Sequence, residues 1–368
     1  MEKYRMLEDV CEILDSQRIP ITASERKAGI YPYYGANGIQ DYVDNYIFDD
    51  DLVLLAEDGG NFGSRDKPIA YRVSGKCWVN NHAHVLKPKS TINVDYLCYT
   101  LMFYDTTGLV NGATRQKLTQ SAMRQMKIPF VKMDVQNEIV ERINLVVDLI
   151  DKRKKQLEKL DELVKSRFVE MFGDPKENPK GYSKRQLKQT CKVITGNTPS
   201  RAVCEYYGEH IEWIKTDNIV SGLINPTTAT EFLSEKGMAV GRTVEKDSIL
   251  MACIAGSLSS IGRVCVTDRK VAFNQQINAI VPNDYNILFL YVLLQISKEY
   301  LVEEINMALK GILSKSKLEE KVFIVPPMEL QEEFAAFVKQ TDKSKFEIKQ
   351  SLEKLELLKK ALMQKYFG

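Results

Sequence analysis

Two short amide-rich segments, Asn80-Asn81-His82 and Asn274-Gln275-Gln276, occupy matched places in the two halves of this chain. Asparagine and glutamine side chains can hydrogen-bond the edge of a nucleic acid base, and polar side chains of many kinds can hold a phosphate oxygen. The interior of a strand usually avoids asparagine, although both segments adjoin apolar, β-branched runs. The alternative is that these amides form local turns, which explains any single residue equally well.

Polar and basic residues in the expected loops and strand ends extend this candidate surface. Arginine and lysine can contact guanine or phosphate, and asparagine and glutamine can contact adenine. In the first half the candidate DNA contacts are Tyr33, Tyr34, Asn37, Arg65, Lys67, Asn81, His82, Arg115, Gln116 and Lys117. In the second half they are Thr198, Ser200, Arg201, Lys215, Thr216, Asn218, Arg263, Gln275, Gln276, Lys310 and Lys315.

A basic run also occurs outside these loops, at Lys152-Arg153-Lys154-Lys155. Such a run is usually a solvated helix face. Its alternative role is to lie over a DNA backbone.

Sequence motifs for catalysis are missing. An enzyme that methylates adenine is expected to carry an Asn/Asp-Pro-Pro-aromatic motif, but the single Pro-Pro pair, Pro326-Pro327, lies between Val325 and Met328. The chain has no GxxxxGK[ST] motif for nucleotide phosphates. The glycine-rich segment 59–63 lacks the GxGxxG spacing and indicates a tight turn. We therefore expect no catalytic residue and no cofactor.

The histidines and cysteines do not predict a metal site. His82 and His84 are two residues apart on an expected strand and so share a face, but His210 is the only other histidine. The seven cysteines form no CxxC pair and are odd in number, which indicates reduced thiols. We expect them to be small buried apolar residues rather than nucleophiles or metal ligands.

The chain contains an internal repeat, and its most regular part is a long helix that occurs twice. Residues 136–173 and 331–368 align without a gap at an offset of 195, from Gln136/Gln331 to Gly173/Gly368. Upstream segments match at offsets of 180 (5–20 with 185–199), 196 (51–60 with 247–256) and 194 (79–88 with 273–282). The segments 116–129 and 314–327 occupy the same place before the two helices, and the second half carries an insertion near 221–241. The fixed order of these matches indicates a duplication.

Each half is expected to be a mixed α+β domain followed by a long helix. Short β-branched runs at 51–56, 192–196 and 263–266 indicate strands, and the stretches 94–104 and 286–305 indicate helices. Prolines at 129 and 326 mark the starts of the long helices. We therefore expect a first domain at 1–132, a helix at 133–173, a linker at 174–182, a second domain at 183–327 and a helix at 328–368.

Apolar residues in both long helices follow 3-4 spacing, as in Ile143, Val146 and Ile150 of the first and Leu352 and Leu355 of the second. A helix with one apolar stripe needs a partner along its length. The repeat favours an antiparallel coiled coil of the two helices within one chain, with pseudo-twofold symmetry. The alternative is a coiled coil between two chains, without a DNA role. Two related domains on such a spacer suit a two-part DNA site with an unread gap.

Composition sets the class of protein. Hydrophobic residues make up 44% of the chain and charged residues 27%, which is typical of a folded globular protein. The net charge of +2 neither requires nor excludes nucleic acid. The sequence shows no apolar run long enough to span a membrane and no signal peptide, so we expect a cytoplasmic protein.

The chain resembles the specificity subunit of type I restriction-modification systems. The residues that carry the resemblance are PYYGANGIQDYVDNYIFDD and LLAEDGG in the first half, VITGNTPSR and IEWIKTDNI in the second, and the helix ends EMFGDP and QKYFG. The similarity covers nearly the whole chain, although no single motif is a fingerprint.

This resemblance implies two tandem target-recognition domains and no catalysis by the chain itself. It implies double-stranded DNA as a partner, together with two methyltransferase subunits that bind S-adenosylmethionine and methylate adenine. Restriction subunits that use ATP and Mg²⁺ are possible further partners. The alternative from a different class is a scaffold that joins two proteins and never touches DNA.

Overall fold

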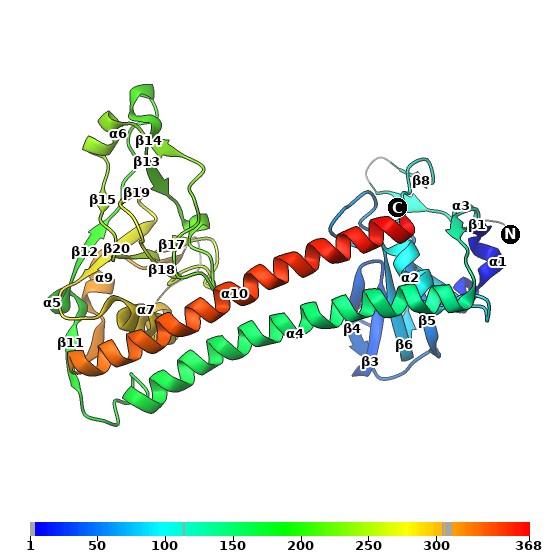
Figure 1. Ribbon diagram of the computed structural model, residues 1–368, viewed down its shortest axis with the longest axis horizontal. Helices are drawn as coiled ribbons and strands as arrows, with labels where there is room; N and C mark the ends of the chain where they lie inside the picture. The colour runs from blue at the N-terminus through cyan, green and yellow to red at the C-terminus, as the bar shows by residue number, and fades with distance from the viewer. Residues whose placement is uncertain (1–3, 113–114, 304, 306–310) are drawn as a thin grey trace. The chain divides into compact units, whose positions relative to one another are not determined.

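The computed structural model describes residues 4–112, 115–303, 305 and 311–368. The chain folds into two compact units. Unit 1 consists of Met1–Lys152 with Leu352–Gly368, and unit 2 consists of Arg153–Ser351. Each unit combines a strand-rich part with segments of the same two long helices, α4 and α10 (Figure 1).

The main sheet of unit 1 has six strands, in the spatial order β2, β7, β5, β6, β3, β4. Neighbouring strands are antiparallel except β3 and β6, which run parallel. Residues 52–56 of β5 are fully buried, as expected for an apolar run in a central strand. The bounds are β2 Cys11–Ile13, β3 Ala28–Gly35, β4 Gly38–Val43, β5 Phe48–Ala56, β6 Ala70–Val79 and β7 Ala83–Pro88.

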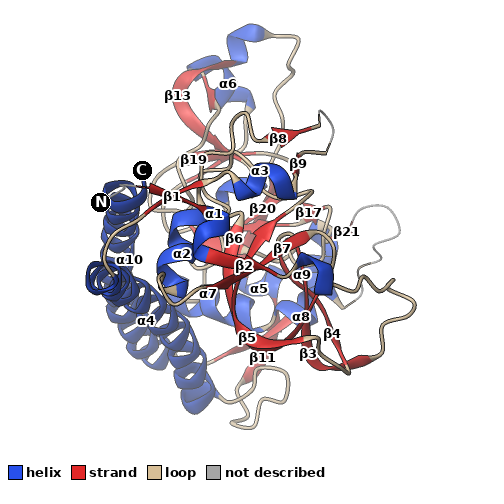
Figure 2. Cartoon of the chain, turned by 90° about the vertical axis from the view of Figure 1, so that its right-hand side faces the viewer, coloured by secondary structure: helices blue, strands red, loops and turns tan. Residues whose placement is uncertain are grey.

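Helix α2 (Val94–Met102) packs against β5 and β6 of this sheet (Figure 2). It begins after Asn93, whose side chain accepts hydrogen bonds from the backbone N–H groups of Asp95 and Tyr96. The smaller elements of unit 1 are α1 Leu7–Val10, η1 Asp15–Gln17, α3 Gln120–Arg124, the pair β1 Tyr4–Met6 and β10 Lys127–Pro129, and the pair β8 Val110–Asn111 and β9 Lys117–Leu118.

Unit 2 has two four-stranded sheets, in the orders β12-β20-β16-β18 and β14-β13-β19-β15. Their strands are β12 Cys191–Thr195, β13 Tyr207–Ile214, β14 Phe232–Leu233, β15 Thr243–Val244, β16 Ile249–Ala252, β18 Val264–Val266, β19 Val271–Phe273 and β20 Ile277–Pro282. Two further strand pairs are β11 Ser183–Gln186 with β22 Val322–Val325, and β17 Ile254–Ala255 with β21 Gly311–Ile312. The short helices are α5 Leu187–Thr190, η2 Cys204–Tyr206, η3 Thr216–Asn218, α6 Glu235–Val240, α7 Ile287–Ile296, α8 Lys298–Val302 and α9 Lys315–Glu320.

The two units repeat one topology with one clear difference. The long strand β6 of unit 1 pairs with β5 over most of its length and with β3 at its end. In unit 2 its place is taken by two strands, since β18 pairs with β16 and β19 pairs with β13. Residues 267–270 separate these two strands, so the single sheet of unit 1 becomes two sheets in unit 2.

Two expectations from the sequence are wrong in detail. The helix expected over 286–305 is interrupted at Ser297, where ψ is 15° and the backbone leaves the helical region between α7 and α8. The alignment of segment 116–129 with segment 314–327 is also displaced by three residues from the match that the structure shows. The helix-capping residues Thr119 and Ser314 correspond in the structure, which restores the offset of 195.

Helices α4 (Met133–Phe172) and α10 (Met328–Phe367) each have 40 residues, which is a length of about 60 Å. In unit 2 they lie antiparallel and in contact, with ion pairs Arg167–Glu333 and Asp161–Lys345. In unit 1 the contact includes a hydrogen bond from Arg142 to the hydroxyl oxygen of Tyr366. The two long helices therefore pair within the chain, as the repeat predicted.

Each long helix ends on the domain of the other half. The rings of Phe168 and Phe172, at the end of α4, are fully buried in unit 2 against Phe289 and Phe334. The end of α10 packs on the core of unit 1, where the ring of Phe367 lies 5.2 Å from that of Tyr96. The core of each unit is thus completed by a helix that begins after the other domain.

Candidate nucleic-acid interface

The two amide-rich segments form the same turn in both units. The side-chain oxygens of Asn80 and Asn274 accept hydrogen bonds from the backbone N–H groups of His82 at 2.8 Å and Gln276 at 3.1 Å. The two asparagines are buried, while Asn81 and Gln275 at the turn tips are exposed. The asparagines therefore form local turns, and the turns present the next side chain to solvent.

The end of a central strand holds each turn in the same way. The carbonyl oxygen of His82 accepts hydrogen bonds from the backbone of Glu57 at 2.9 Å and of Asp58 at 3.5 Å. The carbonyl of Gln276 likewise accepts from Cys253 at 2.8 Å and Ile254 at 3.2 Å. The position of each turn is thus set by the sheet rather than by the loop alone.

In unit 1, Asp58 is the centre of a cluster of candidate residues. Its Oδ1 lies 2.6 Å from Nδ1 of His82 and accepts a hydrogen bond of 2.6 Å from Nη2 of Arg115. Next to it, the side chain of Asn37 donates to the carbonyl oxygen of Gly59, and the N–H of Gly59 donates to the carbonyl of Gln116. Residues from three separate loops therefore meet around the segment 57–59.

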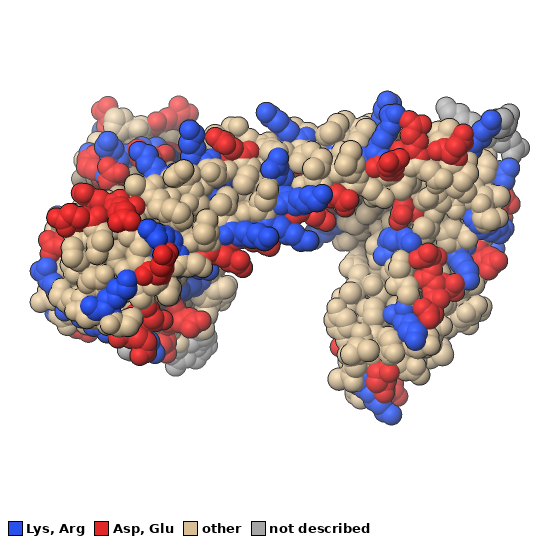
Figure 3. Space-filling model, turned by 60° about the horizontal axis from the view of Figure 1, so that its bottom comes forward, with Lys and Arg blue, Asp and Glu red and all other residues tan. Residues whose placement is uncertain are grey.

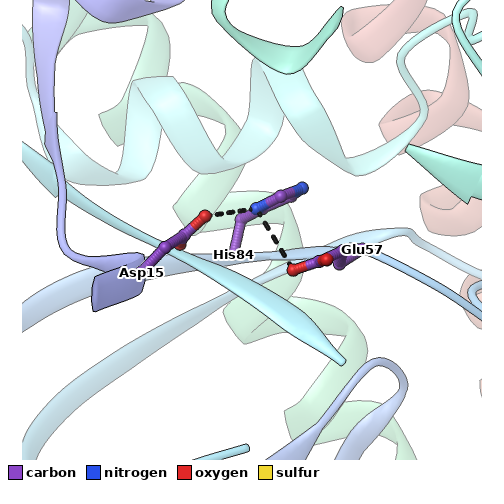
Figure 4. Close-up of side chains that lie close together, drawn as sticks. All are labelled: Asp15, Glu57 and His84. Atoms are coloured by element: carbon purple, nitrogen blue, oxygen red, sulfur yellow. Dashed lines mark hydrogen bonds and ion pairs between the residues drawn. The ribbon is translucent and has the colours of Figure 1, made fainter. Parts of the chain in front are cut away.

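A largely buried network of charged and polar side chains adjoins this cluster. Figure 4 shows three of its members, Asp15, Glu57 and His84. Nδ1 of His84 lies 2.6 Å from a carboxylate oxygen of Asp15 and 3.7 Å from Glu57. Glu57 also pairs with Arg18 at 2.7 Å and with Lys117 at 3.0 Å. The network ties strands β5 and β7 to η1 and to the start of β9.

The carboxyl groups of this network are held ionised. Burial alone raises the pKa of Asp15, but hydrogen bonds from His84, Val85 and Gln120, with the charge of His84, bring it below its ordinary value. Burial also raises the pKa of Glu57, but the hydrogen bonds of Arg18 and Lys117, with the charges of His84 and Arg18, bring it below its ordinary value.

Asp15, Glu57 and His84 place possible metal-ligand atoms within 4.8 Å of one another. Each of these atoms already has a protein partner, since Nε2 of His84 lies 2.9 Å from the carbonyl oxygen of Leu118 and Glu57 is paired with two cations. The guanidinium of Arg18 next to both carboxylates disfavours a metal cation. The cluster is explained as a hydrogen-bonded network.

Unit 2 has uncharged residues at the same three places. Thr195, Cys253 and Asn278 occupy the positions of Asp15, Glu57 and His84 in the repeat. The hydroxyl of Thr195 donates to the side-chain oxygen of Asn278 at 2.8 Å, and the amide of Asn278 donates to the sulfur of Cys253 at 3.2 Å. The supporting layer is therefore ionic in unit 1 and neutral in unit 2.

A second group of candidates in unit 2 lies around the loop 197–201 and strand β13, where Thr198, Ser200 and Arg201 are exposed and Lys215 is half-buried. The hydroxyl of Thr198 donates to the side-chain oxygen of Gln275, while Ser200 is exposed beside it. Arg201 and Lys215 share the carboxylate of Glu231. The carboxylate is kept ionised because both cations lower its pKa, Lys215 having the larger effect.

Some of the predicted contacts are not surface residues. Tyr33 is 1% exposed and donates its hydroxyl to the carbonyl of Ile21, and Tyr34 is half-buried beside Tyr71. Asn218 is 7% exposed and satisfies local backbone through hydrogen bonds to Thr228 and Lys215. These residues therefore make contacts within the fold and are not part of a free surface.

The remaining candidates are spread over other elements. Thr216 and Arg263 are half-buried and joined by a hydrogen bond from the guanidinium to the Thr216 carbonyl. Arg65 and Lys67 are exposed in the loop between β5 and β6, and Lys315 pairs with Glu319 on α9. Lys310 lies outside the described residues.

Sequence reasoning missed two acidic residues, Asp58 and Glu231, that orient the exposed arginines. An acidic residue is not an expected contact for DNA, so the sequence alone points to neither of them. A detectable signal was the location of Asp58, two residues after the end of the buried strand β5.

Charge on the molecular surface is mixed. On the face that Figure 3 shows, Lys and Arg side chains are interspersed with Asp and Glu and are frequent along the long helices. In the basic run, Lys152, Lys154 and Lys155 are exposed and Arg153 is half-buried with a hydrogen bond to Gln156. On this face the cations are therefore interspersed with acidic residues and do not form one large basic patch.

The buried thiols are poor nucleophiles. Burial raises the pKa of Cys11, Cys77, Cys98, Cys191, Cys253 and Cys265 to about 12. Among the described residues, no helix has the length and apolar character that crossing a membrane requires.

Comparisons with known proteins agree on one family. A family model described as the type I restriction modification DNA specificity domain matches residues 2–162 and 179–359. A Haemophilus influenzae protein, provisionally named as a type I restriction enzyme specificity subunit, is 37% identical over 147 residues, which are 40% of this chain and 38% of that protein. The MjaIX specificity subunit of Methanocaldococcus jannaschii is 27% identical over 309 residues, which are 74% of this chain and 68% of that protein. The chain thus spans well under half of the first relative.

Two solved structures share the fold along almost the whole chain. The S subunit of a type I restriction-modification system from M. genitalium has a TM-score of 0.63 at 15% identity and covers 99% of this chain and 96% of its own. A chain from a study of complex assembly in a type I system has a TM-score of 0.57 at 15% identity, with 99% and 97% covered.

Proposed function

Because this chain belongs to the type I restriction modification DNA specificity family, we propose that it is a specificity subunit that reads a two-part site on double-stranded DNA. Each unit reads one half of the site with its own loops. The chain carries out no catalysis itself and holds two methyltransferase subunits, which bind S-adenosylmethionine. Restriction subunits that use ATP and Mg²⁺ complete the assembly where they are present.

The repeated turn is the observation that carries this proposal. Asn80–His82 and Asn274–Gln276 have the same hydrogen bonds to the sheet, but different side chains at the exposed positions. A common framework with different exposed groups suits two readers of different short sequences. Helices α4 and α10, which pair within the chain, remove the need for a coiled coil with a second copy.

Exposed cations in the loop between β5 and β6 supply the non-specific part of the binding. Arg65 and Lys67 are exposed, with no side-chain partner in the described part of the chain. Free cations on loops neutralise phosphates and make affinity salt-dependent. We also include the exposed lysines of the run 152–155 among the phosphate contacts.

Co-expression of the chain with its methyltransferase subunits, followed by methylome sequencing, tests the proposal. A methylated two-part motif is expected. Exchange of residues 183–327 for the matching segment of a family member is expected to change one half of the motif and leave the other half intact. Absence of any two-part motif contradicts the proposal, and so does an exchange that leaves the methylation unchanged, as a protein scaffold would.

A further inference from the structure

We propose that Arg115 in unit 1 and Arg201 in unit 2 each read a guanine, and that Asp58 and Glu231 are the positioning residues that orient them. This inference rests on the proposed function and names the specificity-determining residue of each half-site. The inference rests on two arginines in unrelated loops. In each, a carboxylate binds one edge of the guanidinium, and the side chain is exposed to solvent.

Arg115 has one edge bound and its other donors free. Nη2 of its guanidinium lies 2.6 Å from Asp58, and the side chain is 60% exposed. The same carboxylate oxygen lies 2.6 Å from His82, so Asp58 is itself held in place. The guanidinium has five N–H donors, and within the described residues Nε and Nη1 of Arg115 have no partner.

Gly59 gives this guanidinium room. Its φ is +62°, and a β-carbon at this position would lie 3.4 Å from Nε of Arg115. A side chain here would have to adopt a conformation that favours glycine and would lie against the arginine. A larger residue at position 59 would therefore crowd the guanidinium of Arg115 next to its contact with Asp58.

Arg201 is fixed by a carboxylate and by two rings. Nη2 lies 2.5 Å from Glu231, and the centre of the guanidinium lies 4.5 Å from the ring centre of Tyr207 and 5.4 Å from that of Trp213. Its side chain is 58% exposed. Stacking on aromatic faces suits the planar guanidinium and restricts its rotation.

Other arginines of the chain differ in position or in burial. Arg142 on α4 and Arg185 on β11 also pair with a carboxylate, at 55% and 42% exposure, but they lie outside the loops next to the two turns. Arg26 also stacks on an aromatic ring, that of Tyr33, and pairs with Asp41, but its side chain is only 18% exposed. Arg18 is paired with Glu57 at 12% exposure. Their guanidinium groups are used inside the fold, whereas those of Arg115 and Arg201 are directed to solvent.

A fixed and exposed guanidinium suits a base better than a phosphate. Guanine presents O6 and N7 in the major groove, and arginine contacts both with two parallel N–H groups. This contact needs a defined orientation, which a carboxylate on one edge provides, so less side-chain freedom is lost on binding. A phosphate accepts a lysine almost as well and does not require the orientation.

The test uses the full chain co-expressed with its methyltransferase subunits, and compares Arg115→Lys, Arg201→Lys and the control Arg124→Lys. Arg124 is half-buried and paired with Glu8, outside the cluster around Asp58. Methylome sequencing is expected to show one guanine of one half-site relaxed in Arg115→Lys, one guanine of the other half-site relaxed in Arg201→Lys, and the wild-type motif in the control. Affinity for a duplex with the wild-type motif is expected to fall roughly 10- to 100-fold in the first two variants.

The positioning residues are tested by Asp58→Asn and Glu231→Gln, which keep the arginine. Each is expected to relax the same guanine as the matching arginine variant while the melting temperature stays unchanged. The inference is overturned if the lysine variants keep the wild-type motif, or if they weaken binding to all sequences equally and lower the salt dependence, as phosphate contacts do. A wild-type complex without a two-part motif would instead refute the proposed function.

Discussion

The side-chain oxygen of Gln136 accepts a hydrogen bond of 2.8 Å from the backbone N–H of Asn93, the residue that caps α2. Gln136 is fully buried in the first turn of α4, and its amide donates to the carbonyl oxygens of Thr91 and Val131. Gln331 of α10 makes the equivalent bond to Asn286 at 2.9 Å. In both units a buried amide therefore joins the start of the long helix to the cap of the helix on the sheet.

Gln136→Ala is expected to lower the free energy of unfolding of unit 1 by about 2–4 kcal/mol, because it removes a fully buried amide and leaves the part-buried N–H of Asn93 and the carbonyl oxygens of Thr91 and Val131 without this partner. Urea unfolding followed by circular dichroism measures this. Gln331→Ala is expected to have a similar effect on unit 2, whereas Gln340→Ala, an exposed glutamine of α10, is expected to change little. An effect of Gln136→Ala no larger than that of Gln340→Ala would contradict this role.

Acid is expected to weaken unit 1 through the Asp15–His84 network. The pKa values of Asp15 and Glu57 are lower in the folded protein than in the unfolded chain. Their contribution is therefore complete above the ordinary carboxyl pKa of about 4 and is lost as the pH falls through the lower folded values.

Asp15→Asn is expected to cost about 3 kcal/mol near neutral pH, because Arg18 loses one of its two carboxylate partners and His84 loses its hydrogen-bonded carboxylate, and clearly less at pH 3. Urea unfolding of the wild type and the variant between pH 3 and pH 7 measures the difference. The matched change in unit 2, Thr195→Val, removes a neutral hydrogen bond and is expected to have an effect independent of pH. A cost of Asp15→Asn that does not vary with pH would exclude an ionic contribution.

Phe172→Ala and Phe367→Ala are a matched pair with unequal expected effects. Phe172 is fully buried among Phe168, Phe289 and Phe334, so its loss is expected to cost about 3–5 kcal/mol. Phe367 is half-buried against Tyr96, so its loss is expected to cost less. Differential scanning calorimetry measures both, and equal destabilisation by the two changes would be inconsistent with the burial.

Lys67→Ala is expected to weaken DNA binding for all sequences alike and to lower the slope of log affinity against log salt by about 1. The reason is that Lys67 is exposed and has no acidic partner in the described part of the chain, as expected for a phosphate contact. Fluorescence anisotropy of the full complex over a series of salt concentrations measures the slope. Lys89→Ala is the control, since Lys89 is occupied by the carbonyls of Glu8 and Asp9, and a slope change equal to that of Lys67→Ala would contradict the assignment.

The local patterns of the sequence predicted the fold well. The apolar run 51–56 became the central strand β5, and the 3-4 spacing of Ile143, Val146 and Ile150 became the buried face of α4. These features depend on neighbours in the sequence. The interruption at Ser297 and the division of the sheet of unit 2 depend on tertiary packing, which no local pattern shows.

The candidate site was predicted less well, because side-chain direction depends on distant partners. Tyr33 looked like a loop aromatic, but its strand β3 pairs with β6, so the ring turns into the core. Asp58 orients Arg115 across 57 residues and Glu231 orients Arg201 across 30 residues. Such pairs are visible only once the chain is folded.

Because each long helix ends on the domain of the other half, the order of synthesis limits the order in which the two units can fold. Unit 2 is one continuous stretch, Arg153–Ser351, whereas unit 1 needs Leu352–Gly368 to cover its core. On the ribosome, the domain that emerges first is therefore the last to be completed. During that interval the surface around Tyr96 stays open to solvent, so we expect chaperone dependence and protease sensitivity to concentrate in the earlier-made half of the chain.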